Sequence, residues 1–167
     1  MLTITCVHLI PVNAPISLKG GSRIRIVMEG NMYRKIIVPI EIGNIDKGEK
    51  ILRKAASLLD AGGEIIVLNV VEDVPTYVAV ELPVSIVEDA MKDGRERLEG
   101  LVVRTGIPAT VEIRNGPPAN GILSTAESYG ADLIIVASHV PDFSNYFIGA
   151  TADRIVRHAK CSVLVDR

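Results

Sequence analysis

The chain has 167 residues, a usual length for one domain, and its hydrophobic content of 48% is enough to bury a sizeable core. Its formal net charge of −2, with acidic and basic residues interspersed, argues against a nucleic-acid partner, because binding to a phosphate backbone needs a net basic face. Cys6 and Cys161 have no metal-ligand spacing and do not suggest a disulfide framework, so we expect no metal site and a reducing, cytoplasmic location.

Residues 1–31 do not fit the pattern of the remaining chain. They lack a basic segment before their apolar part and an Ala-x-Ala cleavage site, and polar residues and prolines interrupt that part. We therefore expect neither a signal peptide nor a membrane span. Two interpretations stay open: a mis-called start, with Met32 as the true first residue, or a real extension, disordered or adding an edge strand over 23–28. The predicted domains are this extension over 1–31 and a folded domain over 32–167.

The first part of the folded domain is predicted to form a strand, a helix and a second strand. The apolar, β-branched run 35–40 (KIIVPI) is typical of a strand buried on both faces. Asn44 or Asp46 can cap the helix, which is expected to end at Gly62-Gly63. Its apolar face consists of Ile51, Leu52, Ala55, Leu58 and Leu59. The second buried strand is expected over 64–71 (EIIVLNVV).

A long loop over 73–83 precedes an amphipathic helix that begins near Val84 and ends at Gly106, with its charged side chains on the solvent side. The run 109–114 (ATVEIR) alternates apolar and polar residues more than the other runs, as expected for a strand near the edge of a sheet. The sequence NGPP that follows predicts a turn into another helix, which ends before Gly130.

The last part of the chain contains a polar loop between a buried strand and a helix. The strand is expected over 133–137, and the helix has Ala152, Ile155, Val156 and Ala159 at helical spacing before a last strand over 162–165. At the start of this helix stands the sequence Gly-Ala-Thr (149–151). A helix start leaves backbone N–H groups unpaired at the positive end of the helix dipole, which suits a phosphate.

Five strands that alternate with four helices predict an α/β fold. Short connections and right-handed crossovers make this a doubly wound, five-stranded parallel sheet with helices on both faces. In such a sheet, ligands bind at the C-terminal ends of the strands where the winding reverses.

The segment 131–167 resembles the C-terminal half of the universal stress protein family. The nucleotide-binding members of that family carry Gly-x-x-Gly, nine further residues, and Gly-[Ser/Thr]. Here Ala137 and Val140 stand at the first two glycine positions, the spacer is one residue short, and Ala150 replaces the Ser or Thr, whereas Gly149 remains. The sequence Ala-Ser-His-x-Pro-Asp, followed by an aromatic-containing loop, is similar to the F/G branch of the family, in which ATP binding is expected. The resemblance begins at Met32 and extends to the C-terminus.

The resemblance implies the strand order 3-2-1-4-5, with the crevice between strands one and four. It also implies a nucleotide site made of Pro39, Ile40, Glu41, Ile65, Gly116, Ala137, Ser138, His139, Gly149, Ala150 and Thr151. Of these, residues 39–41 and Ile65 would border the adenosine, and residues 138–139 and 149–151 would lie near the phosphates. Glu41 takes the place of the family's usual aspartate and reaches one methylene further, towards a ribose hydroxyl or a metal-bound water. For Gly116, a loop glycine and a ligand contact are equally good interpretations.

Two functions follow from this pattern. The first is an ATP-binding stress or regulatory module, with or without Mg²⁺ and without strong catalytic activity. Slow hydrolysis stays open, although no water-positioning group is identifiable and His139 is more simply a solvated residue. The alternative is a nucleotide-free, dimeric interaction protein of the same fold, which the missing glycines favour. In both cases a homodimer is expected through the apolar last strand at the sheet edge.

Overall fold

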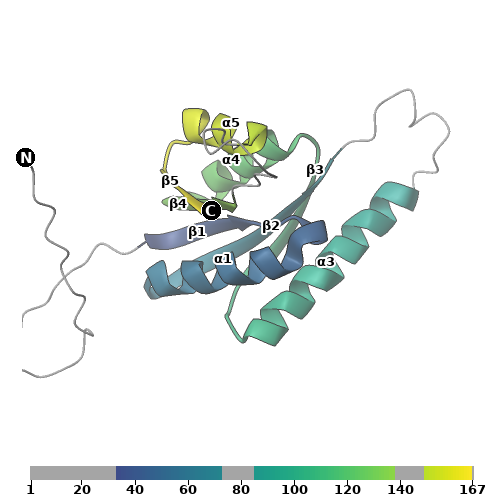
Figure 1. The fold of residues 1–167 in the computed structure, drawn as a ribbon, viewed down its shortest axis with the longest axis horizontal. Helices are drawn as coiled ribbons and strands as arrows, with labels where there is room; N and C mark the ends of the chain where they lie inside the picture. The colour runs from purple at the N-terminus through teal and green to yellow at the C-terminus, as the bar shows by residue number, and fades with distance from the viewer. Residues whose placement is uncertain (1–32, 73–84, 138–148, 167) are drawn as a thin grey trace, which may run out of the picture. The chain divides into compact units, whose positions relative to one another are not determined.

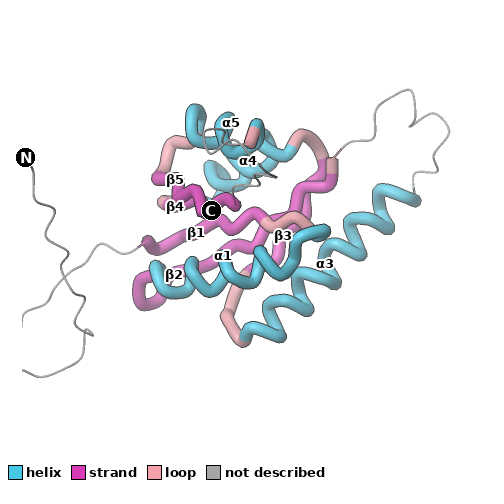
Figure 2. The backbone as a smooth tube through the Cα atoms, viewed as in Figure 1, coloured by secondary structure: helices cyan, strands magenta, loops and turns pink. Residues whose placement is uncertain are grey.

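The computed structural model describes residues 33–72, 85–137 and 149–166, and these contain a five-stranded, all-parallel sheet (Figures 1 and 2). The strands are β1 (Tyr33–Pro39), β2 (Leu59–Val71), β3 (Thr110–Asn115), β4 (Leu133–Ala137) and β5 (Ser162–Asp166). The helices are α1 (Ile45–Leu58), α3 (Ser85–Thr105), α4 (Pro118–Tyr129) and α5 (Ala150–His158), with a 3-10 turn, η1 (Ile42–Asn44), before α1. The strand order β3-β2-β1-β4-β5 confirms the predicted sheet.

The core has two halves, one on each face of the sheet, because successive residues of a strand point to opposite faces. On one face, α1 and α3 pack against alternate strand residues such as Ile36 and Val67. On the other face, α4 and α5 pack against the intervening residues, such as Ile37 and Ile66. Figure 1 shows the same division of the helices between the two faces. The sheet is therefore doubly wound, as predicted, and its winding reverses between β1 and β4.

The helix and strand that meet at Leu59 differ from the prediction. Helix α1 ends at Leu58, so Gly62-Gly63 do not end it, and Leu59 is the first residue of β2 rather than part of the helix face. Leu59 pairs with Tyr33, whereas Lys35 pairs with Glu64, so the register shifts between the two pairs. Gly62 has a φ of +80° within this irregular stretch, a conformation that glycine adopts without a steric penalty.

The other boundaries agree with the prediction to within two residues, which is the usual uncertainty of element ends. Strand β3 lies at a sheet edge, as its alternating sequence predicted, and Gly130 ends α4 in the left-handed conformation with φ +61°. Val156, expected on the buried side of the last helix, is instead 46% exposed. Predictions for residues 1–31, 73–84 and 138–148 lie outside the described residues.

Asp132 links β1 to β4 and β5 by hydrogen bonds, at the point where the winding of the sheet reverses. Its carboxylate accepts hydrogen bonds from the backbone N–H groups of Arg34 (2.8 Å) and Lys35 (3.0 Å) at the start of β1. Its own backbone N–H donates to the Lys35 carbonyl (3.0 Å), and its carbonyl accepts from Ser162 at the start of β5 (3.2 Å). These bonds hold β1, β4 and β5 in register, so that the C-terminal ends of the strands meet at one edge.

Candidate functional site

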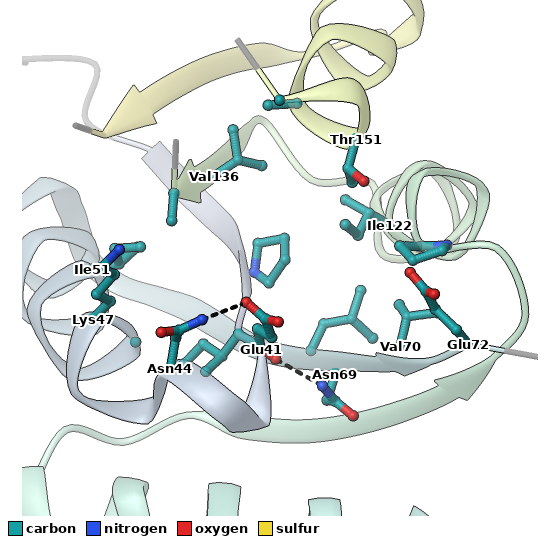
Figure 3. Close-up of a pocket in the computed structure, with 18 of the residues that line it drawn as sticks. Glu41, Asn44, Lys47, Ile51, Asn69, Val70, Glu72, Ile122, Val136 and Thr151 are labelled. Atoms are coloured by element: carbon teal, nitrogen blue, oxygen red, sulfur yellow. Dashed lines mark hydrogen bonds between the residues drawn. The ribbon is translucent and has the colours of Figure 1, made fainter. Parts of the chain in front are cut away.

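A cavity of about 540 Å³ lies at the C-terminal edge of the sheet where the winding reverses (Figure 3). Its wall combines the ends of β1, β2 and β4 with parts of α1, α4 and α5. The lining residues are Pro39, Ile40, Glu41, Asn44, Lys47, Gly48, Ile51, Leu68, Asn69, Val70, Glu72, Pro118, Ile122, Val136, Ala137, Gly149, Ala150, Thr151 and Ala152. Cavities of this size accommodate small molecules and cofactors, and this position is where open α/β sheets bind their ligands.

Of the predicted site residues that the structure describes, most lie together around this cavity. Those that line it are Pro39, Ile40, Glu41, Ala137, Gly149, Ala150 and Thr151. They come from three segments that are far apart in the sequence, and the parallel sheet places them at one edge. Ser138 and His139 lie outside the described residues.

Ile65 and Gly116 do not line the cavity, in contrast to their predicted position. Ile65 pairs with Ile36 in the middle of the sheet and is 1% exposed, since β2 continues for six residues beyond it. Leu68 of β2, which pairs with Pro39, reaches the cavity instead. Gly116 is buried in the turn between β3 and α4. Its φ of +124° favours glycine, and its N–H donates to the Val71 carbonyl (2.9 Å), which accounts for a glycine in this turn.

The N-terminus of α5 forms one wall of the cavity. Gly149 is the N-cap residue and its carbonyl accepts the first bond of the helix, from the N–H of Asp153 (2.9 Å). The N–H groups in the first turn of any α-helix have no partner within the helix. At this end, no side chain among the described residues caps them either. Together with the helix dipole, they form a site of positive potential that suits an anion.

Gly149 itself has an ordinary extended backbone, with φ −55° and ψ 151°. Any residue adopts this conformation without strain, so the backbone does not require a glycine at this position. Close approach of a ligand to the main chain is the other common reason for a glycine next to a cavity.

Charged and polar side chains line the wall opposite α5. Glu41 is exposed, and its carboxylate accepts a hydrogen bond from the Asn44 side chain (2.7 Å), while the Asn44 N–H donates to the Glu41 carbonyl (3.0 Å). Figure 3 shows the Glu41 carboxylate between Asn44 on one side and Glu72 on the other. With Lys47, the charged lining of the described residues is two carboxylates and one ammonium group. The η1 turn thus presents Glu41 to the cavity in a defined position.

Asn69 is a buried polar residue of the site that the sequence analysis did not identify. It is 8% exposed, and its side-chain amide donates to the Ile40 carbonyl (2.8 Å). The Ile40 N–H in turn donates to the Leu68 carbonyl (2.8 Å), so two bonds fix the chain where it leaves β1. The signal for Asn69 was present, because it is the one uncharged polar residue within the apolar run 64–71.

Other chemistry has little support in the described parts of the chain. They contain no group of three or more His, Cys, Asp and Glu residues with the spacing of a metal site. Burial raises the pKa of the Cys161 thiol, and nearby Asp132 raises it further, which keeps that thiol in its unreactive protonated form. None of the helices within these residues is long and apolar enough to cross a membrane.

The fold and the cavity define a doubly wound α/β protein with a cavity at the point where the winding of its sheet reverses. The family model of the universal stress protein family matches residues 32–167, and the chain therefore belongs to this family. Universal stress protein G of Shigella flexneri is 28% identical over 142 residues, which cover 81% of this chain and all of that protein. Universal stress protein MJ0531 of Methanocaldococcus jannaschii is 27% identical over 143 residues, covering 81% and 82% of the two chains.

Solved structures agree on the fold. Hypothetical protein MJ0577 superposes with a TM-score of 0.66 at 22% identity, over 80% of this chain and 95% of that one. A universal stress protein in complex with cAMP has a TM-score of 0.56 at 16% identity, over 81% and 98%. At these identities the likeness concerns the arrangement of helices and strands.

Proposed function

We propose that this chain is an ATP-binding regulatory module of the stress response, active in the cytoplasm and without strong catalytic activity. One observation carries the proposal. The start of α5, whose first N–H groups no described side chain caps, and the residues 39–41 at the end of β1 line one cavity of about 540 Å³. Such a cavity offers an anion site and a separate, partly apolar wall, which a nucleotide needs for its phosphates and its nucleoside.

In this proposal the backbone N–H groups of Gly149, Ala150 and Thr151 bind the phosphates. The nucleoside lies against Pro39 and Ile40 on the opposite wall, and the Glu41 carboxylate accepts from a ribose hydroxyl or from a metal-bound water. The cAMP complex of a structural neighbour supports the idea, since that protein has the same fold and holds an adenine nucleotide.

The proposal is one of binding and not of turnover. Phosphoryl transfer to water needs a group that positions the attacking water. Glu41 is the carboxylate that Figure 3 shows in the middle of the cavity, and the proposal assigns it to a ribose hydroxyl or to a water of the metal's shell rather than to the attacking water. We therefore expect hydrolysis of ATP to be slow or absent.

A nucleotide-free interaction protein of the same fold is the second candidate. The charged lining favours it, because Glu41 and Glu72 outnumber Lys47 and repel phosphates unless a cation such as Mg²⁺ is bound with them. Ala137 also stands at the cavity where the family's nucleotide-binding members have a glycine. Either candidate would act as a homodimer, with β5 at the sheet edge providing the contact.

Mass analysis of the small molecules released when the purified protein is denatured separates the two candidates. The proposal predicts an adenine nucleotide, or its uptake after incubation with ATP and Mg²⁺. A phosphate-release assay on the same sample addresses turnover. A protein that neither carries nor takes up a nucleotide would favour the interaction module.

A further inference from the structure

Gly48 in α1 lies unusually close to Ile40 across the cavity wall. A Cβ atom at position 48 would be 2.5 Å from Cγ2 of Ile40 and 3.1 Å from its Cδ1. Carbon atoms do not pack at 2.5 Å, so any side chain at this position forces a neighbour to move. Both Gly48 and Ile40 line the cavity.

Neither partner can move without changing the cavity. Ile40 is 4% exposed, and its main chain is fixed by the bonds to Leu68 and to the Asn69 side chain. Helix α1 is anchored by Ile51 and Leu52, which are 2% and 0% exposed. A substitution at position 48 would therefore turn the Ile40 side chain from its site or push the first turns of α1 outward. Both changes alter the same wall.

In two further helices, a glycine packs closely against a residue that lines the cavity. A Cβ at Gly94 of α3 would be 3.3 Å from the Asn69 side-chain oxygen, and one at Gly121 of α4 would be 3.0 Å from both methyl carbons of Val70. Asn69 and Val70 line the cavity too. Glycine weakens a helix interior relative to alanine, so its presence needs another reason, and close packing against the cavity wall provides one.

The contrast with other glycines of the chain makes Gly48 specific. A Cβ at Gly43, in the η1 turn five residues earlier, or at Gly100 of α3 would meet no atom within 4 Å. Close packing is therefore not a property of every glycine in or near the helices, and the contact at Gly48 is shorter than those at Gly94 and Gly121. Figure 3 shows Lys47 and Ile51 of the same helix across the cavity from Thr151, so this wall lies away from the start of α5.

We infer that Gly48 is a positioning residue: the missing side chain lets Ile40 keep its position, and the pair sets the room available to the nucleoside end of the ligand. This inference rests on the proposed nucleotide site and assigns a role to a helix residue outside the glycine motif of the loop. Since α1 and the start of α5 form different walls, a change at Gly48 acts first on the wall of Ile40 and α1 and not on the start of α5.

The test is calorimetry with ATP on wild type, Gly48→Ala, Ile40→Ala and the double variant, with Gly100→Ala, another glycine inside a helix, as the matched control. Gly48→Ala should weaken ATP binding roughly tenfold, the size of effect that overpacking produces. Gly100→Ala should bind within about twofold of wild type, because its methyl group enters open space away from the cavity. In the Ile40→Ala background, where the clashing methyl groups are absent, Gly48→Ala should cost much less than in wild type.

Melting temperatures of all variants separate a local change of the cavity from a general loss of structure. The inference is overturned if folded Gly48→Ala binds ATP as wild type does, or if its loss of affinity is the same with and without the Ile40 side chain. A wild type that does not bind ATP overturns the proposed function and this inference with it. A wild type that binds, beside a variant that binds equally, overturns the inference alone.

Discussion

Replacing Gly149 by valine separates the phosphate-binding role of α5 from its structural role. The N–H groups of residues 149–151 are proposed to bind the phosphates, and a branched side chain at position 149 would stand between them and the ligand. A hydrogen bond to a charged oxygen is worth about 1.5 to 3 kcal/mol. The loss of two such bonds would reduce affinity by more than about a hundredfold, so Gly149→Val should show no measurable binding.

The fold should tolerate this change. Position 149 has φ −55° and ψ 151°, which valine adopts without strain. The cost is that of a poorer N-cap residue, on the order of 1 kcal/mol, or a few degrees in melting temperature. Gly149→Ala, with a smaller side chain, should give an intermediate loss of affinity. Gly100→Val serves as the control, because a side chain there enters open space.

Calorimetry with ATP and a thermal melt of each variant provide the two readouts. If wild type and Gly149→Val bind ATP equally, the start of α5 is not the phosphate site. If the variant loses its fold along with its binding, the steric argument fails as well, since the backbone geometry predicts a folded protein.

Four further predictions concern the ligand, the fold and the assembly. Thr151→Ala should weaken ATP binding by about 0.5 to 1.5 kcal/mol if its hydroxyl donates an ordinary hydrogen bond, or about 1.5 to 3 if the acceptor is charged; unchanged affinity would remove the hydroxyl from the site. Asp132→Ala should lower the free energy of unfolding by about 1 to 3 kcal/mol in urea titrations, because two N–H groups of β1 lose their acceptor, and an unchanged midpoint would contradict that role. Deleting residues 1–31 should leave the melting temperature and ATP binding nearly unchanged, and a large loss of stability would show that the extension is structural. Sedimentation should reveal a homodimer that substitutions in β5 dissociate; a monomer at all concentrations would refute this.

The sheet was predictable because most of its strands contain a continuous apolar run, and the run of β3 alternates apolar and polar residues, with turn signals between the runs. The run 64–71 is an example, since burial on both faces leaves almost no room for polar residues. The extent of the same strand was not predictable. Leu59 has the spacing of a helix residue, and only its pairing with Tyr33, a long-range contact, assigns it to β2.

The site was predictable to the extent that it depends on strand ends and on the glycine motif. Pro39 and Gly149 could be placed at one edge because parallel strands present their C-terminal ends together. Ile65 was predicted at the cavity, but Leu68 is the residue of β2 that pairs with Pro39 at the end of β1. This pairing depends on the register between β1 and β2, which the sequence does not reveal. The role of Gly48 could not be predicted from the sequence, because it depends on the close contact with Ile40, which only the structure reveals.

Titration of ATP with Mg²⁺ into nucleotide-stripped wild-type protein tests whether the cavity binds ATP. We predict saturable binding with one ATP per chain, and competition by ADP, because the phosphates and the nucleoside each have a wall of the cavity. It also predicts that Gly149→Val abolishes the signal. No heat of binding from wild type, confirmed by the absence of protection in a thermal melt with excess ATP, would contradict the account and leave the nucleotide-free interaction module in its place.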